Sequence, residues 1–190
     1  MYSPVPSAID PVDSDDVSDT SHLKPRVALP RVSLAATTGG EVCLAETPGI
    51  SVLIVYPWTG RPGHPNPPNW DDIEGAHGST PKLEGFRDLA PDFAALDIAL
   101  FGLSGQTTDW QREMAARLSL PFPILSDAEG PFASALSLPS FATGGGIYLK
   151  RLTLILSSGT IEASFFPVPN PASHAGEVLR WIRENAAGSA

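Results

Sequence analysis

Apolar residues recur along this chain both as short continuous runs and as amphipathic segments. The runs at 51–56 and 98–103 have the length of strands and lack polar alternation, which is typical of strands buried on both faces. Hairpins are predicted where two strand-like segments flank a turn sequence rich in Gly, Ser and Thr. The predicted strands are 32–35 paired with 42–45, 51–56, 98–103, 123–125, and 152–156 paired with 161–166.

Apolar residues at intervals of three and four predict four helices. The first is predicted to begin at Thr80-Pro81, because a threonine hydroxyl suits the N-cap and proline suits the first helical position. The predicted helices are 81 to about 94 with a kink at Pro91, a segment from Thr107 or Thr108 through Leu118, 131–136, and a segment starting at Ser173. This order of elements predicts an α/β, thioredoxin-like fold, with helices on both faces of a mixed sheet.

The first part of the chain differs in composition from the rest. Residues 1–28 are acidic, rich in Pro and Ser and poor in large apolar groups, so they bury too little surface to offset the entropy cost of ordering. We expect a flexible or partly docked arm over 1–28 and one thioredoxin-like domain over 29–190. A chain of 190 residues that is 42% hydrophobic is long enough for one sizeable core.

Charge and cysteine content narrow the function classes. A net charge of −9 without a Lys/Arg cluster disfavours binding to nucleic acid or to anionic membranes. No apolar run approaches the roughly 20 residues of a membrane span, and the first residues lack the basic n-region and apolar h-region of a signal peptide, so a cytoplasmic location is expected. Cys43 is the one cysteine. It allows no intramolecular disulfide and is expected to be packed or on an edge strand.

Ser79 is predicted to lie at the mouth of the first helix. A cysteine there would meet the positive end of the helix dipole and unpaired backbone N–H groups, which lower the pKa of a thiol and favour the nucleophilic thiolate. A serine stays a neutral alcohol unless a base takes its proton. The segment therefore has the form of a redox-active thiol motif with a hydroxyl in place of the thiol.

Six short motifs occur in a fixed order along the chain. They are Tyr-Pro at 56–57, Gly-Ser-Thr-Pro at 78–81, Gly-Phe-Arg-Asp at 85–88, Phe-Gly-Leu-Ser at 101–104, Leu-Pro-Phe-Pro-Ile-Leu-Ser-Asp at 120–127, and Lys-Arg-Leu-Thr at 150–153. By their order and spacing, the chain from about 30 to 182 resembles a peroxiredoxin of the alkyl hydroperoxide reductase and thiol-specific antioxidant superfamily. It is most similar to the Q-type, or bacterioferritin comigratory, branch.

The resemblance implies where a thiol peroxidase site would lie. The peroxidatic cysteine corresponds to Ser79, the strand-ending proline to Pro57 and the pocket arginine to Arg151. The family's threonine falls on Ala76, which leaves Thr59 or Thr80 for its role, and the resolving cysteine of the Q-type branch falls on Glu84. The implied activity is reduction of a hydroperoxide by an external thiol reductant, without a cofactor.

The remaining pocket candidates are Tyr56, Trp58, Thr59, His77 and Gly78. A Pro-rich insertion over 58–72 is longer than the family's usual turn, and its prolines favour a preorganised wall or simply a rigid surface loop. His77 stands two residues before Ser79, as a base for a serine nucleophile would, although nothing like Gly-x-Ser-x-Gly surrounds the serine. His64, His77, Asp71 and Asp72 match no metal-binding spacing, so no metal is expected.

Two explanations of Ser79 remain open. In the first, the native residue is cysteine, and the serine holds a thiol peroxidase in an inactive or trapped form. In the second, serine is native and the pocket serves another purpose, either binding a small molecule or catalysing a non-redox step. Both explanations predict a small-molecule partner, a peroxide or another ligand, and a homodimer is possible in either.

Overall fold

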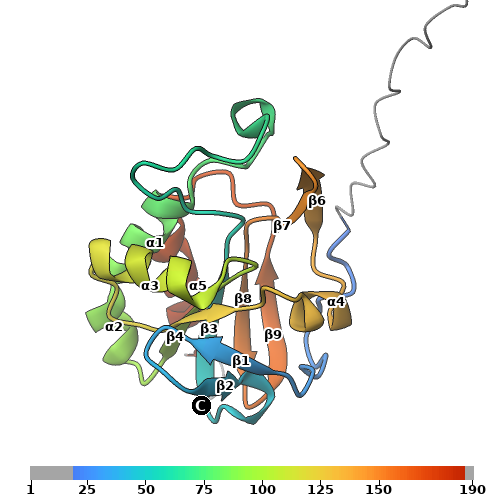
Figure 1. Ribbon diagram of the computed structural model, residues 1–190. Coiled ribbons are helices and arrows are strands. Elements are labelled where there is room, and N and C mark those ends of the chain that lie inside the picture. The colour runs from blue at the N-terminus through green and yellow to red at the C-terminus, as the bar shows by residue number, and fades with distance from the viewer. Residues whose placement is uncertain (1–18, 187–190) are drawn as a thin grey trace, which may run out of the picture.

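The computed structural model describes residues 19–186, which fold around a seven-stranded sheet with the strand order β2-β1-β5-β4-β3-β8-β9 (Figure 1). β3 pairs in parallel with β4 and antiparallel with β8, so the sheet is mixed. A second, two-stranded sheet contains β6 and β7. The strands are β1 Ser33–Ala36, β2 Glu41–Cys43, β3 Ile50–Val55, β4 Ala99–Ser104, β5 Ile124–Ser126, β6 Ser140–Thr143, β7 Gly146–Leu149, β8 Leu152–Ser157 and β9 Thr160–Phe165.

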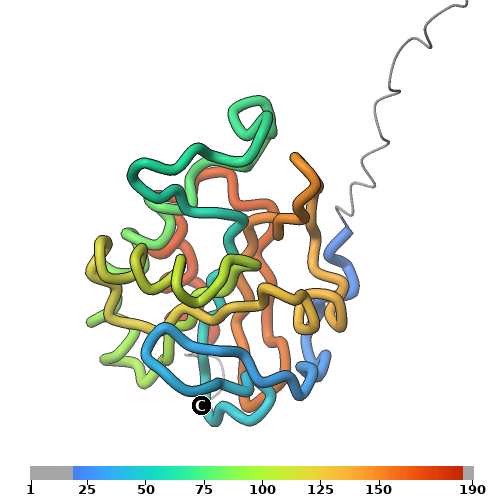
Figure 2. The backbone as a smooth tube through the Cα atoms, in the orientation of Figure 1, coloured from blue at the N-terminus to red at the C-terminus, as the bar shows by residue number. Residues whose placement is uncertain are grey.

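Five α-helices connect and cover these strands, and the backbone trace in Figure 2 follows their connections. They are α1 Ser79–Asp88, α2 Ala90–Ala94, α3 Thr108–Arg117, α4 Pro131–Ala135 and α5 His174–Ala186, with 3₁₀ turns at Leu44–Glu46 and Trp70–Asp72. Among residues 19–186, no helix is long and apolar enough to cross a membrane.

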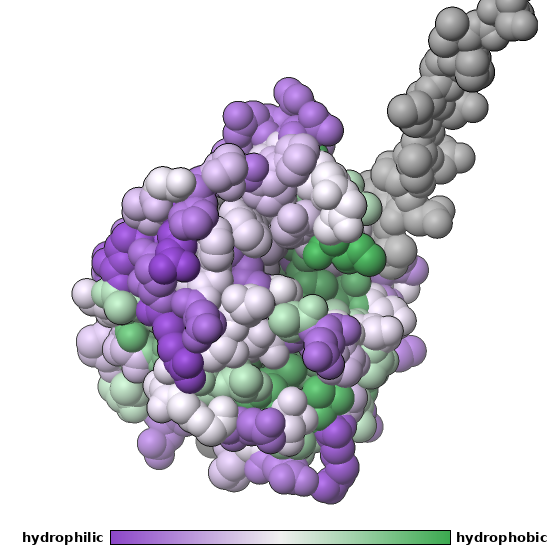
Figure 3. Space-filling model, viewed as in Figure 1, coloured by the Kyte–Doolittle hydropathy of each residue, from purple (hydrophilic) through white to green (hydrophobic). Residues whose placement is uncertain are grey.

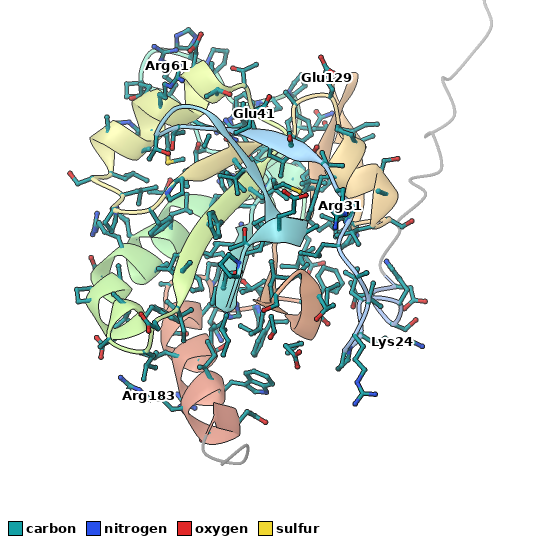
Figure 4. The ribbon with its side chains drawn as sticks, turned by 90° about the horizontal axis from the view of Figure 1, so that it is seen from below. Lys24, Arg31, Glu41, Arg61, Glu129 and Arg183 are labelled. Atoms are coloured by element: carbon teal, nitrogen blue, oxygen red, sulfur yellow. The ribbon has the colours of Figure 1, made fainter. Side chains whose placement is uncertain are left out.

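Two apolar clusters cover the two faces of the sheet. Alternate residues of β3 divide between them, since Val52 and Ile54 belong to one cluster and Leu53 and Val55 to the other. The first cluster includes the apolar sides of α1, α2, α3 and α5, and the second includes α4. Figure 4 shows α5, with Arg183 labelled, well apart from the N-terminal segment that carries Lys24. The predicted thioredoxin-like fold, with helices on both faces of a mixed sheet, is therefore confirmed.

The predicted arm is described only in part. Residues 1–18 lie outside the described residues. Leu23 is 2% exposed and belongs to the second apolar cluster, and Ala28 forms an isolated bridge with Thr160. The segment 19–28 therefore lies against the domain.

The first helix begins and ends differently from the prediction. Gly78, not Thr80, occupies the N-cap position, with a φ of 107°, and α1 starts at Ser79. Glycine reaches this left-handed backbone conformation at little cost, so a backbone turn and not a hydroxyl cap sets the start. The predicted helix with a kink at Pro91 is in fact two helices, α1 and α2, because proline cannot supply the N–H that would continue α1.

The β6–β7 hairpin was not predicted. Its turn is Gly144-Gly145, and both glycines have positive φ, as a tight hairpin turn requires. The hairpin stands beside the long loop after β3 at one end of the molecule (Figure 1). Thr143 Oγ1 joins the two by donating to the carbonyl of Pro68 at 2.6 Å.

Candidate functional site

Tyr56 and Pro57 end the β3 region where the chain leaves the sheet towards α1. Ligands of α/β proteins commonly bind beyond the carboxyl ends of parallel strands, and β3 is one of these. Both residues are buried, and burial raises the pKa of the Tyr56 phenol, so it stays protonated at neutral pH. Neither residue lines the cavity at α1. Tyr56 and Pro57 are instead packed in the interior at this end of the sheet.

Ser79, the first residue of α1, is 3% exposed, and its Oγ has no hydrogen-bond partner among the described residues. The N–H groups of the first helical turn have no partner within the helix and carry the positive end of the helix dipole. A buried hydroxyl without a partner costs free energy that a ligand or water can recover. The start of α1 is therefore suited to an oxygen-bearing ligand.

Gly78 brings the start of α1 close to a distant part of the chain. A Cβ at this position would lie 2.7 Å from Cγ of Pro171 and 3.3 Å from Nη2 of Arg151. With a φ of 107° as well, only glycine fits here without strain.

Arg151 immediately precedes β8 and is 6% exposed, so it is a buried residue and not a surface charge. Its Nη2 donates to the main-chain carbonyl of His77, while its Nε is buried without a partner among the described residues. Burial lowers the pKa of Arg151 to about 10, so the guanidinium remains charged at neutral pH. The structure thus places this charge against the backbone that leads into α1.

A cavity of about 320 Å³ opens at the start of α1. The predicted pocket residues Trp58, Thr59, His77, Gly78, Ser79 and Thr80 line it, together with Gly60, Asn66, Trp70, Ala76 and Pro81. The indole Nε1 of Trp58 is buried there without a partner, like the hydroxyl of Ser79. Two residues that line the cavity therefore carry a buried polar atom without a partner among the described residues, and the indole can only donate.

Part of the insertion forms one wall of this cavity. Trp58 packs against Trp110 and Tyr148, with ring centroids 4.9 and 5.9 Å apart, and Trp70 packs against Tyr148 at 5.1 Å. These contacts fix the loop on the β6–β7 hairpin. Aromatic pairs of this kind contribute about 0.5–1.5 kcal/mol each beyond their buried area.

Thr59 and Thr80, the two candidates for the family's threonine, differ in their surroundings. Thr59 is 1% exposed, and its hydroxyl donates to Oε1 of Gln106 at 3.0 Å. Gln106 Nε2 returns a bond to the Thr59 carbonyl at 3.0 Å. Thr80 is the second residue of α1 and makes no capping bond. Gln106 therefore holds Thr59 rigidly at the cavity wall.

The histidine beside Ser79 does not act on it in this structure. The exposed ring of His77 lies with Nε2 2.7 Å from Oδ1 of Asp71, whereas Ser79 Oγ has no partner. The alternative of a serine activated by His77 is thus not supported by the geometry. His64 packs on Trp110, and no group of three His, Cys, Asp or Glu side chains within residues 19–186 is arranged to hold a metal.

Two buried basic residues near the site were not predicted. Lys82 is 0% exposed, and its Nζ donates to the carbonyls of Val55 at 3.1 Å and Leu152 at 2.7 Å. Desolvation, and then the charge of Arg151, lowers its pKa well below the usual 10.5. His174 is 2% exposed, contacts Thr153 Oγ1 at 3.0 Å and has its pKa lowered to about 4 by burial. The sequence gives no signal for either beyond the three-residue spacing of Ser79 and Lys82.

No cysteine lies beside Ser79 among the described residues, and the second position at which the resemblance implies a cysteine holds a glutamate. Cys43 is on β2, the edge strand, which β1, β5 and β4 separate from β3. Glu84, which the resemblance aligns with the resolving cysteine, forms an ion pair with Arg87 at 3.7 Å. Within residues 19–186, no thiol lies at the start of α1.

Comparison with known proteins gives a consistent set of relatives. A family model described as Redoxin matches residues 24–179. Two Mycobacterium tuberculosis proteins, from strains H37Rv and CDC 1551, are provisionally named as peroxiredoxins. Each is 29% identical to this chain over 110 residues, which is 56% of this chain and 71% of the relative.

Solved structures match over most of the chain. A PrxQ cysteine-to-serine mutant of Xylella fastidiosa has a TM-score of 0.71 and 20% identity, covering 87% of this chain and 98% of its own. Peroxidoxin BcpB of M. tuberculosis has a TM-score of 0.69 and 23% identity, covering 86% and 98%. The bacterioferritin comigratory protein of Xanthomonas campestris, described for alkyl peroxide reduction, has 0.68 and 22%, covering 86% and 99%. At these identities the matches show a shared fold.

Proposed function

This chain belongs to the Redoxin family, as its resemblance to peroxiredoxins predicted. On that premise we propose that its α1 cavity binds a small oxygen-rich ligand, either a neutral hydroperoxide or a small oxyanion, without reducing it. The observation that carries the proposal is the buried, unpartnered Oγ of Ser79 at the helix start. It stands where the resemblance places the peroxidatic cysteine.

In a thiol peroxidase, a thiolate attacks the O–O bond of the peroxide, so that the sulfur is oxidised to a sulfenic acid while the second oxygen leaves as an alcohol or water. A serine hydroxyl has no corresponding oxidised form, and Cys43 lies on the far edge of the sheet. The scaffold is that of a thiol peroxidase family, while the redox step is absent at position 79. We therefore propose an inactive peroxidase scaffold that retains ligand binding.

The groups around the cavity favour a ligand that accepts hydrogen bonds. Trp58 Nε1 can only donate a hydrogen bond, and the Ser79 hydroxyl can donate one. The first N–H groups of α1 point out of the start of the helix, where Ser79 lies. Arg151 adds a positive charge behind the 77–78 backbone. A cavity of about 320 Å³ suits a ligand of a few heavy atoms.

The binding half of the proposal is tested on the unmodified protein by nuclear magnetic resonance. Titration with tert-butyl hydroperoxide should shift the indole N–H signal of Trp58 and the amide signal of Ser79. The indole of Trp181, on α5, serves as the internal control because it lies outside the cavity. If the Trp58 and Ser79 signals stay in place at millimolar peroxide, the cavity does not bind hydroperoxides.

The redox half is tested with Ser79→Cys, using Ser79→Ala as the matched control. The unmodified protein and Ser79→Ala should show no oxygen adduct at residue 79 after hydrogen peroxide treatment, and no peroxide turnover with dithiothreitol. Ser79→Cys should gain oxygen at residue 79 by intact mass and peptide mapping. Turnover by the unmodified protein would contradict the proposal.

The same variant separates the two explanations of the serine. If Ser79→Cys turns over peroxide with a thiol reductant, the missing thiol is the sole loss, and the protein is a peroxidase held inactive by serine. If Ser79→Cys is inert while the unmodified protein still binds its ligand, the pocket has been repurposed for binding or a non-redox reaction.

A further inference from the structure

A second cavity, of about 670 Å³, lies on the other side of the 77–78 backbone from the α1 cavity. Gly78 separates the two, because it lines the first while Pro171 and Arg151, which line the second, lie against it. We call the second cavity the Arg151 groove. It is lined by residues of the segment before α1 (Glu74, Gly75 and His77), by residues of the segment after β9 (Phe166, Pro167, Val168, Pro169 and Pro171), and by Phe141, Lys150 and Arg151.

Within residues 19–186, Arg151 has no counter-ion in this groove. Arg151 is 6% exposed, makes one hydrogen bond, to the carbonyl of His77, and forms no ion pair with a carboxylate of residues 19–186. Its Nε is buried without a partner in the same range. The acid that lines the groove is Glu74, which is exposed. A buried guanidinium without a counter-ion is costly, and a carboxylate that accepts two of its N–H bonds is its best geometric match.

The titratable side chains packed nearest to Arg151 are basic, so they add no negative charge beside its guanidinium. Lys82 and His174 lie near Arg151. Burial and then the charge of Arg151 lower the pKa of Lys82, and burial and then the charge of Lys82 lower the pKa of His174. Of the nearby carboxylates, Glu74 is exposed and Glu177 contacts His174 at 3.4 Å, so neither balances Arg151. The free charge of Arg151 therefore favours an anionic ligand.

The walls of the groove are apolar and stiff. Phe141 and Phe166 are half-buried, and Val168 is 7% exposed. Prolines at 167, 169 and 171 restrict the opposite wall, which lowers the entropy cost of holding a binding shape. A small inorganic anion would leave these walls uncovered, whereas a ligand with an apolar body would cover them.

We propose that the Arg151 groove binds a monocarboxylate with an aromatic or short alkyl body, its carboxylate on the guanidinium of Arg151 and its body between Phe166 and Val168. The size of the groove agrees with a small-molecule site. This site is separate from the α1 cavity and does not depend on the identity of residue 79.

The probe is 4-phenylbutyrate, compared with its uncharged amide by calorimetry on the full chain. We expect the carboxylate to bind at least about tenfold more tightly than the amide, since a hydrogen bond to a charged group contributes about 1.5–3 kcal/mol. Binding should weaken as salt is raised. Equal affinity for acid and amide, or no binding of the acid at millimolar concentration, would overturn the proposal.

Variants place the ligand in the groove. Arg151→Gln should lose about tenfold or more in affinity, and Phe166→Ala should lose severalfold. Arg183→Gln is the matched control, because it removes an exposed arginine on α5 whose partner is Asp92. If Arg151→Gln does not fold, Phe166→Ala and Val168→Asp test the walls alone, and unchanged affinity in both overturns the assignment. Ser79→Ala should bind phenylbutyrate normally, which separates this site from the α1 cavity.

Discussion

Ser79 and Lys82 lie one turn apart on the same face of α1, yet their polar atoms are in opposite situations. Ser79 lines a cavity, and its Oγ has no partner among the described residues, whereas Lys82 Nζ donates to two main-chain carbonyls. Those carbonyls belong to Val55 and Leu152, which face each other across β3 and β8. Lys82 therefore ties the start of α1 to the sheet, and Ser79 is left for a ligand.

The contrast has an energetic meaning. A buried hydroxyl without any partner costs up to about 1–3 kcal/mol, less where water or a ligand in an adjoining cavity can bond to it, and proteins tolerate such costs chiefly at functional sites. A buried lysine is costly too, but its two bonds to carbonyls recover part of that cost if the amine is neutral. This comparison is tested by substituting each residue in turn and measuring the change in the free energy of unfolding.

The largest expected effect is on the pH dependence set by Lys82. Because burial lowers its pKa well below 10.5, the unfolded chain holds a proton that the folded chain lacks throughout the window between the two values. The free energy of unfolding should therefore rise with pH from the lowered pKa of the folded amine up to about 10.5, by up to about 1.4 kcal/mol per pH unit. Lys82→Met should remove this slope, as measured by urea denaturation at several pH values.

Lys24→Met provides the control for that experiment. Lys24 is exposed on the N-terminal segment (Figure 4), so its removal should leave the slope as it is in the unmodified protein. A slope that survives Lys82→Met would show that the amine is protonated in the fold. The contrast with Ser79 would then be between a charge and a hydroxyl, not between two neutral groups.

A smaller loss of stability is expected from Gly78→Ala. The new side chain would have to accept a φ of 107° and a contact of 2.7 Å with Pro171, which together should lower the free energy of unfolding by about 2 kcal/mol. Gly75→Ala is the matched control, since Gly75 has a φ of 79° with nothing within 4 Å. Equal losses in both variants would mean that backbone strain alone, and not the approach to Pro171, requires glycine at 78.

Much of the fold followed from the apolar pattern. The runs at 51–56 and 98–103 are β3 and β4, and both predicted hairpins are present, because strands buried in a sheet leave continuous apolar runs. The β6–β7 hairpin was missed although Gly144-Gly145 is a turn signal. Its strands pack mainly against a loop, and Ile147 is 76% exposed, so its apolar residues do not mark one buried face.

The distribution of apolar residues on the surface could not be predicted from local sequence patterns either. Figure 3 shows mostly polar residues on the visible face, with apolar residues gathered on the side of α4 and the β6–β7 hairpin. Such a patch depends on which elements meet, and local periodicity does not reveal it. A sequence pattern predicts an element's own buried side better than the loops and hairpins around it.

The candidate site was predictable in position and less so in its contacts. The resemblance placed Ser79 and Arg151, and both are buried beside the backbone at 77–78. Lys82 was not anticipated, because a lysine is normally exposed and only the approach of two strand ends makes its burial possible. Pairing across 70 residues, as between Lys82 and Leu152, leaves no local trace in the sequence.

The smallest effect on stability should come from Ser79→Ala. Its hydroxyl has no partner to lose, so the free energy of unfolding should change by less than about 0.5 kcal/mol or rise slightly. Thr59→Val is the matched comparison in the same cavity. It removes a hydroxyl that donates to Gln106 and should cost about 1 kcal/mol. If Ser79→Ala is as destabilising as Thr59→Val, the serine is used by the fold and is no longer evidence for a ligand. If it leaves stability intact while abolishing the peroxide-induced shift of the Trp58 signal, its hydroxyl serves binding alone.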